Sequence, residues 1–155
     1  MLKKAIKVVI GVFGLLFILF YSGPKVEAPE LYKSLPEVPQ DLVELASWID
    51  SREVTVENLK EGNQSRIEFF DSIPQKTEYS VIYFHGFSAS SEEGAPFHRD
   101  VAKHFKANLY LPRLLGHGID GDSPMSDFTA NAYLESAREA LAVAKTLGEQ
   151  VIVLG

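Results

Sequence analysis

The chain has 155 residues and a formal net charge of −6, and 46% of its residues are hydrophobic against 23% that are charged. This composition excludes wholesale disorder, and the excess of acidic residues excludes a globally basic nucleic-acid binder. The absence of cysteine excludes disulfides, thiolate metal sites and a cysteine nucleophile. The length alone predicts one domain with one core.

Residues 1–23 are expected to stand apart from the globular fold. Lys3, Lys4 and Lys7 precede 14 uncharged residues, Val8 to Tyr21, and the rest of the chain is strongly acidic. A basic start, an apolar stretch and an acidic body are typical of an exported or membrane-tethered protein, with the body outside the cytoplasm.

Two interpretations of this segment remain open. Fourteen helical residues span about 21 Å, less than a hydrocarbon core of about 30 Å, which favours a cleaved signal peptide. Neither candidate cleavage site, Val26-Glu27-Ala28 or Tyr21-Ser22-Gly23, fits the small-x-small pattern well, and each is followed by proline. This favours an uncleaved membrane anchor. We expect the anchor, with secretion after signal cleavage as the alternative.

Residues 24–40 are predicted to be an extended linker that holds the domain off the membrane, because four prolines interrupt any helix there. The domain proper is expected over residues 41–155. Asp41 is typical of an N-cap, and the spacing of Leu42, Leu45, Ala46 and Ile49 predicts a short amphipathic helix.

The next two segments show the alternation of half-buried strands. Residues 53–57 and 66–70 alternate apolar with polar side chains, and Gly62-Asn63 lies between them. This pattern predicts an antiparallel hairpin with a longer loop.

After residue 78 the pattern changes to alternating strands and helices. Val81–Phe84 is a continuous apolar run, as in a strand buried on both faces. The elements that follow are a helix over 96–105, a strand over 109–111, a helix over 129–147 closed by Gly148, and a strand over 151–154. This order predicts a parallel sheet with helices on its faces.

Ligands of such a sheet bind at the carboxyl ends of its strands, so the loop after Phe84 is the first candidate site. His85-Gly86 can turn the backbone so that the next N–H points into the cleft and stabilises an oxyanion. The alternative is a plain turn, in which Gly86 supplies the conformation and His85 bonds a loop carbonyl.

The second loop, residues 116–121, spells G-x-G-x-x-G, the fingerprint of dinucleotide binding. Four residues separate it from the preceding strand, and Asp122-Ser123-Pro124 follows where a helix should begin. Without a helix N-terminus there is no pyrophosphate site. Asp120 and Asp122 lack the other ligands of a calcium loop, so no metal is predicted.

The four histidines, His85, His98, His104 and His117, show no spacing of a zinc site. His98 and His104 lie six residues apart on one predicted helix and should point to different faces. We expect all four to be solvated surface residues.

The third loop begins at Gly155, which follows the predicted strand 151–154. In a nucleophile elbow, G-x-S-x-G, the first glycine follows such a strand, and the serine stands on the turn before a helix. The alternative is an ordinary strand that ends in glycine.

Three segments together resemble the N-terminal half of an α/β-hydrolase: Tyr83–Ser90 (YFHGFSAS), Asn108–Gly118 (NLYLPRLLGHG) and Val151–Gly155. The resemblance covers residues 41–155 and is closest to the carboxylesterases, monoacylglycerol lipases and serine aminopeptidases. It implies an α/β fold with a mostly parallel, eight-stranded sheet and helices on both faces, of which this chain contains the first five strands. It also implies a Ser-Asp/Glu-His triad and no metal or organic cofactor.

Carried over to this chain, the resemblance makes the backbone N–H of Phe87 one oxyanion donor, with His85 and Gly86 shaping its turn. The loop of Gly116, His117 and Gly118 would line the cleft mouth. The serine would lie two residues beyond Gly155, and the acid and base further on. Residues 1–155 are therefore expected to be inactive by themselves.

The expected function of the full-length protein is hydrolysis of carboxylic esters, rather than amides, through an acyl-enzyme. Its partners would be a small ester or acyl substrate and the membrane, through residues 1–23. One alternative is a non-catalytic hydrolase-fold protein that binds a lipid, an acyl group or a protein. Another is a complete small α/β module that acts as a membrane-tethered interaction protein.

Overall fold

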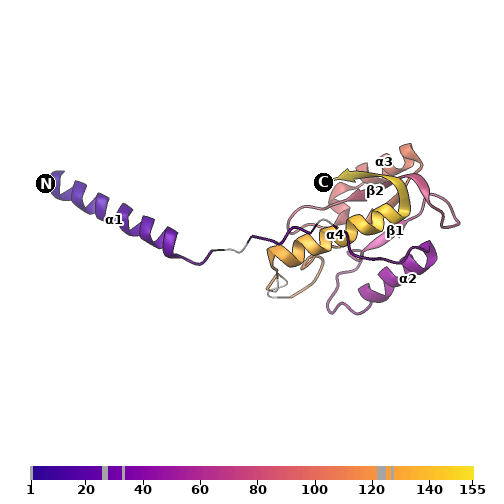
Figure 1. Cartoon of the computed structure of the whole chain (residues 1–155), viewed down its shortest axis with the longest axis horizontal. Helices are drawn as coiled ribbons and strands as arrows, with labels where there is room; N and C mark the ends of the chain where they lie inside the picture. Colours follow the sequence, from indigo (N-terminus) through magenta and orange to yellow (C-terminus); the bar gives the residue numbers. More distant parts are fainter. Residues whose placement is uncertain (1, 26–27, 33, 122–124, 127) are drawn as a thin grey trace.

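The computed structural model of the chain describes residues 2–25, 28–32, 34–121, 125–126 and 128–155. The elements in chain order are α1 (Leu2–Ser22), α2 (Leu42–Glu53), β1 (Arg66–Glu68), β2 (Thr77–Tyr83), η1 (Ser91–Gly94), α3 (Phe97–Phe105), β3 (Asn108–Leu111), α4 (Ala130–Leu147) and β4 (Gly148–Leu154). Figure 1 shows α1 apart from the other elements. The protein is thus a mixed α/β domain preceded by an apolar helix.

The strands form one four-stranded sheet in the order β1-β3-β2-β4. Val81 of β2 lies opposite Leu109 of β3 on one side and Ile152 of β4 on the other, and both pairings are parallel. β1 runs antiparallel to β3. The predicted alternation of strands and helices is confirmed, and the apolar run of β2 lies between two parallel neighbours, as expected for such a run.

Helices cover both faces of the sheet. Successive residues of β2 point to opposite sides, so its apolar side chains pack into two separate cores. Ile82 belongs to a core with α2 and α4, which contains Leu45, Ile49, Tyr110, Ala140, Val143, Ala144 and Leu147. Val81 and Tyr83 face α3 in a second core, with Ala102, Ala107, Leu109 and Leu111. The two cores place the carboxyl end of β2 between two helical layers.

The prediction of α2 is confirmed. The Asp41 carboxylate accepts hydrogen bonds from the N–H groups of Val43 and Glu44, and Leu45 and Ile49 are buried. An N-cap of this kind satisfies donors that the first helical turn leaves free.

The prediction of a strand over residues 53–57 is wrong. α2 continues to Glu53, a turn follows, and Val54 is 86% exposed. Asn58 has a left-handed backbone (φ 54°), which interrupts an extended chain. The end of α2 is held by the ion pair of Glu53 with Arg113, a contact between residues distant in sequence.

The predicted hairpin is therefore absent from the described residues, and β1 pairs with another partner. The segment expected over 66–70 is a strand only at Arg66–Glu68, where Ile67 lies opposite Tyr110 of β3. β3 pairs with β2 on one side only, so the backbone groups on its other side are available to pair with β1.

Gly148 closes α4 as predicted, but its backbone is extended (φ −149°) and directly begins β4. A Cβ at this position would lie 2.4 Å from the backbone nitrogen of Ser80 on β2. The glycine thus allows β4 to approach β2 as the chain leaves the helix. β4 forms an edge of the sheet, and Val153 on it is 56% exposed.

The predicted apolar helix at the N-terminus is confirmed as α1. Residues Lys3–Ser22 form a 20-residue helix that is long and apolar enough to cross a membrane, and none of it is buried in the protein. A signal sequence has the same features. Val26 and Glu27 of one candidate cleavage site lie outside the described residues.

Candidate functional site

The carboxyl ends of β2 and β4 lie side by side. The chain leaves β2 through α3 to reach β3 on one side and returns through α4 to β4 on the other. Such a reversal of strand order is the position where open α/β sheets bind ligands. The N–H of Phe84 donates to the carbonyl of Leu154 (N···O 2.8 Å), so the loop that follows Phe84 begins beside Gly155.

Glycine occurs at two positions near the carboxyl ends of β2 and β4 where neighbouring atoms leave little room for a side chain. A Cβ on Gly155 would lie 3.2 Å from the carbonyl oxygen of Phe84, and one on Gly86 would lie 3.2 Å from both carboxylate oxygens of Glu93. The alternative of a plain turn assigns the turn conformation to Gly86, but Gly86 is not among the residues with a positive φ. The left-handed residue is Ser88 (φ 63°), and Gly86 is suited to its position because Glu93 approaches so closely.

The backbone N–H of Phe87 lies between two anchored neighbours. The N–H of Gly86 donates to Oε2 of Glu93 (2.7 Å), and the N–H of Ser88 donates to Nε2 of His117 (3.0 Å). No residue that the structure describes accepts a hydrogen bond from the N–H of Phe87. A free amide in a fixed turn is suited to bind an anion or a developing oxyanion.

His85 holds this turn from inside the protein. Its ring is buried, Nδ1–H donates to the carbonyl of Gly86 (3.1 Å), and Nε2 accepts from the N–H of Leu114 (3.2 Å). A bond from His85 to a loop carbonyl is what the plain-turn alternative predicts, and the structure contains it. Burial lowers the pKa of His85 below its ordinary value of 6.5, the hydrogen bond with Gly86 opposes this, and nearby His117 lowers the pKa further. The ring is therefore neutral.

The loop of Gly116, His117 and Gly118 lies against the Phe87 turn. Nδ1–H of His117 donates to the carbonyl of Leu115 (2.8 Å), which leaves Nε2 to accept from Ser88. Gly116 (φ 75°) and Gly118 (φ 70°) both adopt the left-handed backbone that favours glycine. The two loops are thus joined through one buried imidazole.

The prediction that all four histidines are solvated is wrong for His85, His98 and His117, which are buried, and holds for His104. His98 packs on the ring of Tyr83 (centroids 5.2 Å apart), and its Nε2–H donates to the carbonyl of Ser91 (2.8 Å). His85 and His117 each accept a hydrogen bond from a backbone N–H 29 residues away, a partner that the sequence does not show. Nδ1 of His98 is buried and has no hydrogen-bond partner among the described residues. His98 and His104 do point to different faces, as predicted.

A network of four charges holds η1, the turn that carries Glu93. Arg99 binds both carboxylate oxygens of Glu68 (2.8 and 2.9 Å) and also Glu92 (3.2 Å), and Arg66 pairs with both glutamates. Hydrogen bonds from Arg99, with those from Arg66, lower the pKa of the Glu92 carboxyl. Sequence analysis missed this network because its members come from β1, η1 and α3.

Aromatic side chains surround the turn on its outer side. Phe87 is 75% exposed, and its ring contacts those of His117 and Phe128 edge-on, at centroid distances of 5.9 and 6.3 Å. Phe128 in turn packs on Tyr133 in the first turns of α4 (5.1 Å). The N-terminal end of α4 therefore belongs to the same edge of the sheet.

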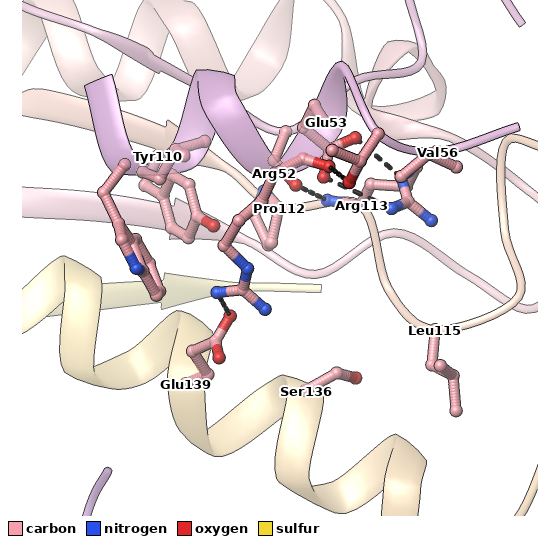
Figure 2. A pocket seen from close by; sticks show the side chains of 13 residues that line it. Arg52, Glu53, Val56, Tyr110, Pro112, Arg113, Leu115, Ser136 and Glu139 are labelled. Carbon is pink, nitrogen blue, oxygen red and sulfur yellow. Dashed lines mark hydrogen bonds and ion pairs between the residues drawn. The ribbon is translucent and has the colours of Figure 1, made fainter. Parts of the chain in front are cut away.

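A separate pocket of about 340 Å³ lies between α2, α4 and the segment after β3. Figure 2 shows Arg52 of α2 reaching Glu139 of α4, while Arg113 pairs with Glu53 at 2.8 Å. The side chains of Arg113 and Glu53 are only 13% and 12% exposed. No residue of the 85–90 loop lines this pocket, so it is distinct from the Phe87 turn.

The glycine-rich residues 116–121 do not lead into a helix, since α4 begins only at Ala130. Among the described residues, no helix N-terminus, which a pyrophosphate site would require, directly follows this loop. Asp122, one of the two aspartates weighed as calcium ligands, lies outside the described residues. Within the described ranges, no group of three or more histidine, aspartate or glutamate side chains is placed to hold a metal ion.

Comparisons with models of protein families, with curated proteins and with solved structures found no match for this chain. Any assignment of this chain to a family is therefore a proposal that depends on its own motifs and on the geometry of the Phe87 turn.

The lowered pKa of His85 predicts a loss of stability in weakly acidic solution. The unfolded chain takes up this proton near pH 6.5, before the folded protein does, so the free energy of unfolding falls as the pH drops below about 6.5. Urea unfolding from pH 8 to 5 would measure this slope. We expect a smaller slope in His85→Gln and the wild-type slope in His104→Gln, whose parent side chain is exposed. An unchanged slope in His85→Gln would contradict the assignment.

Proposed function

We propose that this chain belongs to a serine hydrolase of the α/β-hydrolase superfamily that cleaves carboxylic esters through an acyl-enzyme. The observation that carries the proposal is the N–H of Phe87, which lacks an acceptor among the described residues and lies at the carboxyl end of β2, beside the end of β4. Three segments distant in sequence, all part of the family resemblance, meet at this edge.

The proposed chemistry requires two neighbouring strand ends. A serine on the turn after Gly155 attacks the ester carbonyl carbon, and the carbonyl oxygen becomes an oxyanion that accepts from the N–H of Phe87. The catalytic base takes the proton of the serine and passes it to the alcohol, which leaves as the tetrahedral intermediate collapses to the acyl-enzyme. Water then hydrolyses the acyl-enzyme and releases the carboxylic acid product. β2 and β4 are paired as far as Tyr83 and Leu154, so both groups start from adjacent strands.

The histidines of this edge are unsuited to act as the general base. Both ring nitrogens of His85 are engaged with Gly86 and Leu114, and both of His117 with Leu115 and Ser88. A base needs a free nitrogen within reach of the serine. These bonds argue against His85 and His117 as the base of the proposed triad.

We also propose that α1 is an uncleaved membrane anchor and that the domain lies outside the cytoplasm. Lys3, Lys4 and Lys7 begin the helix, and no charged residue follows before Ser22. The positive-inside rule then places the N-terminus in the cytoplasm. A mature N-terminus near residue 24 or 29, measured by mass spectrometry, would instead indicate a secreted protein.

A fluorophosphonate probe tests the hydrolase assignment, because it reacts covalently with activated serines. We expect labelling of the full-length protein, loss of labelling when the serine two residues beyond Gly155 is replaced by alanine, and no labelling of residues 1–155 alone. Labelling of residues 1–155 would refute the proposal. A full-length protein without a serine at that position would favour the non-catalytic alternative.

A further inference from the structure

The proline-rich segment before α2 is fastened along α4. We call residues 30–40 the strap; residue 33 lies outside the described residues. The backbone N–H of Glu30 donates to Oδ1 of Asn131 (2.8 Å) in the first turn of α4. Further along, Val38 packs against the core that α2 and α4 share. The strap therefore follows α4 from its first turn toward its last.

Arg138 is the central attachment of the strap. Its guanidinium donates to the carbonyl of Ser34, forms an ion pair with Glu135 and lies over the ring of Tyr32, 5.2 Å from the centroid. The Arg138 side chain is only 13% exposed. These contacts tie the strap to α4 through hydrogen bonding, charge and stacking at one residue.

The strap meets α4 at the carboxyl edge of the sheet, by which we mean the side where the carboxyl ends of β2 and β4 lie. α4 ends where β4 begins, so the helix runs back along the strand and its first turn lies level with the carboxyl end of β4. The contacts of Phe128 with Phe87 and Tyr133 place the start of α4 beside the Phe87 turn. In Figure 1, β4 points toward the side from which the chain leaves for α1.

The tether between α1 and this edge is short. Eight peptide steps separate Ser22, the last residue of α1, from Glu30, and a fully extended chain of this length spans at most about 29 Å. The seven residues of β4 extend about 23 Å, so the amino ends of the strands lie about that much farther from the carboxyl edge. The edge that carries the Phe87 turn is thus the one that the tether holds close to the end of α1.

We propose that the carboxyl edge of the sheet faces the lipid surface that α1 spans, with the ring of Phe87 toward the lipid. This inference depends on the proposed membrane insertion of α1 and deepens the proposed function, because it makes membrane-borne acyl esters the substrate class. The lipid surface in this proposal is zwitterionic. Residues 24–155 carry 12 basic and 21 acidic side chains, and anionic lipids would repel this net negative charge.

Lipid-bound quenchers test this orientation in the full chain reconstituted in phosphatidylcholine vesicles. The chain has no cysteine, so single variants accept one fluorophore each. Phe87→Cys probes the carboxyl edge and Ile73→Cys the opposite edge, just before β2; both parent side chains are large, apolar and exposed (75% and 73%). We expect headgroup-labelled nitroxide lipid to remove most of the fluorescence at residue 87 and little at residue 73.

A second pair of variants tests the strap itself. Arg138→Ala removes the central attachment, and we expect it to abolish most of the quenching at residue 87. Arg52→Ala is the matched control, since Arg52 also pairs with a glutamate of α4 but forms no hydrogen bond or ion pair with the described residues of the strap. We expect this control to leave the quenching unchanged.

The outcomes distinguish the inference from the proposals that precede it. Equal quenching at residues 73 and 87, or quenching that survives Arg138→Ala, would overturn the orientation. Failure of the full chain to associate with vesicles would overturn the membrane anchor and the inference with it. The fluorophosphonate result is independent of both, because it depends on the serine and not on the membrane.

Discussion

If the full-length protein is the proposed ester hydrolase, its Phe87→Pro variant is expected to lose about 10²- to 10³-fold in kcat for an ester substrate, the usual cost of one oxyanion donor. Proline removes the backbone N–H together with the exposed ring, which contacts His117 and Phe128. No described residue accepts from that N–H, so the substitution breaks no hydrogen bond among the residues that the structure describes. The preceding residue is Gly86, which tolerates the backbone restriction that proline imposes on its neighbour.

Phe87→Ala is the matched control, because it deletes the exposed ring and keeps the N–H. We expect its kcat to fall far less than that of Phe87→Pro. Steady-state kinetics of both variants, together with their midpoints of thermal unfolding, separates loss of the donor from loss of the fold. A folded Phe87→Pro variant with wild-type kcat would exclude this amide from the oxyanion site.

Asn108→Ala is expected to cost about 3 kcal/mol of unfolding free energy, because Asn108 connects three backbone segments. Its Oδ1 accepts from the N–H of Phe70 (3.0 Å), and its Nδ2 donates to the carbonyls of Gln75 (2.8 Å) and Leu147 (3.0 Å). Its side chain is almost fully buried. The bond to Leu147 is the most enclosed, so its loss carries the largest part of the effect.

Urea unfolding followed by the fluorescence of Trp48, the single tryptophan, would measure this loss. Gln64→Ala is the control: Gln64 is exposed, its side chain forms no hydrogen bond with a described residue, and its replacement should change the unfolding free energy by about 0.5 kcal/mol or less. Asn108→Asp should also destabilise the fold, because it places a carboxylate oxygen opposite two carbonyls. An Asn108→Ala variant within about 1 kcal/mol of the wild type would contradict this role.

The parts of the fold that were predicted correctly have a local physical cause. The apolar run of β2, the N-cap and spacing of α2, and the long pattern of α4 depend on neighbours within a few residues. The strand predicted over residues 53–57 failed for the opposite reason. Its alternating pattern is overruled by the end of α2, which an ion pair with Arg113 holds in place.

The candidate site was predicted in part. The sequence indicated that His85, Gly86 and Phe87 follow a buried strand and that Gly155 ends another, since glycine and apolar patterns mark such positions. It did not indicate that His117 is buried and accepts a hydrogen bond from Ser88, or that Glu93 binds the N–H of Gly86. These partners lie on other elements, and only the folded chain brings them within hydrogen-bonding distance.

By itself, the sequence determined the α/β class, the apolar N-terminal helix and the loops that follow the strands, because periodicity and turn chemistry act within a few residues. The tertiary structure decided that β4 lies beside β2, that Arg138 fastens the strap, and that the N–H of Phe87 has no acceptor among the described residues. Strand order, buried ion pairs and free donors arise from contacts between distant segments, whose energies no local pattern encodes.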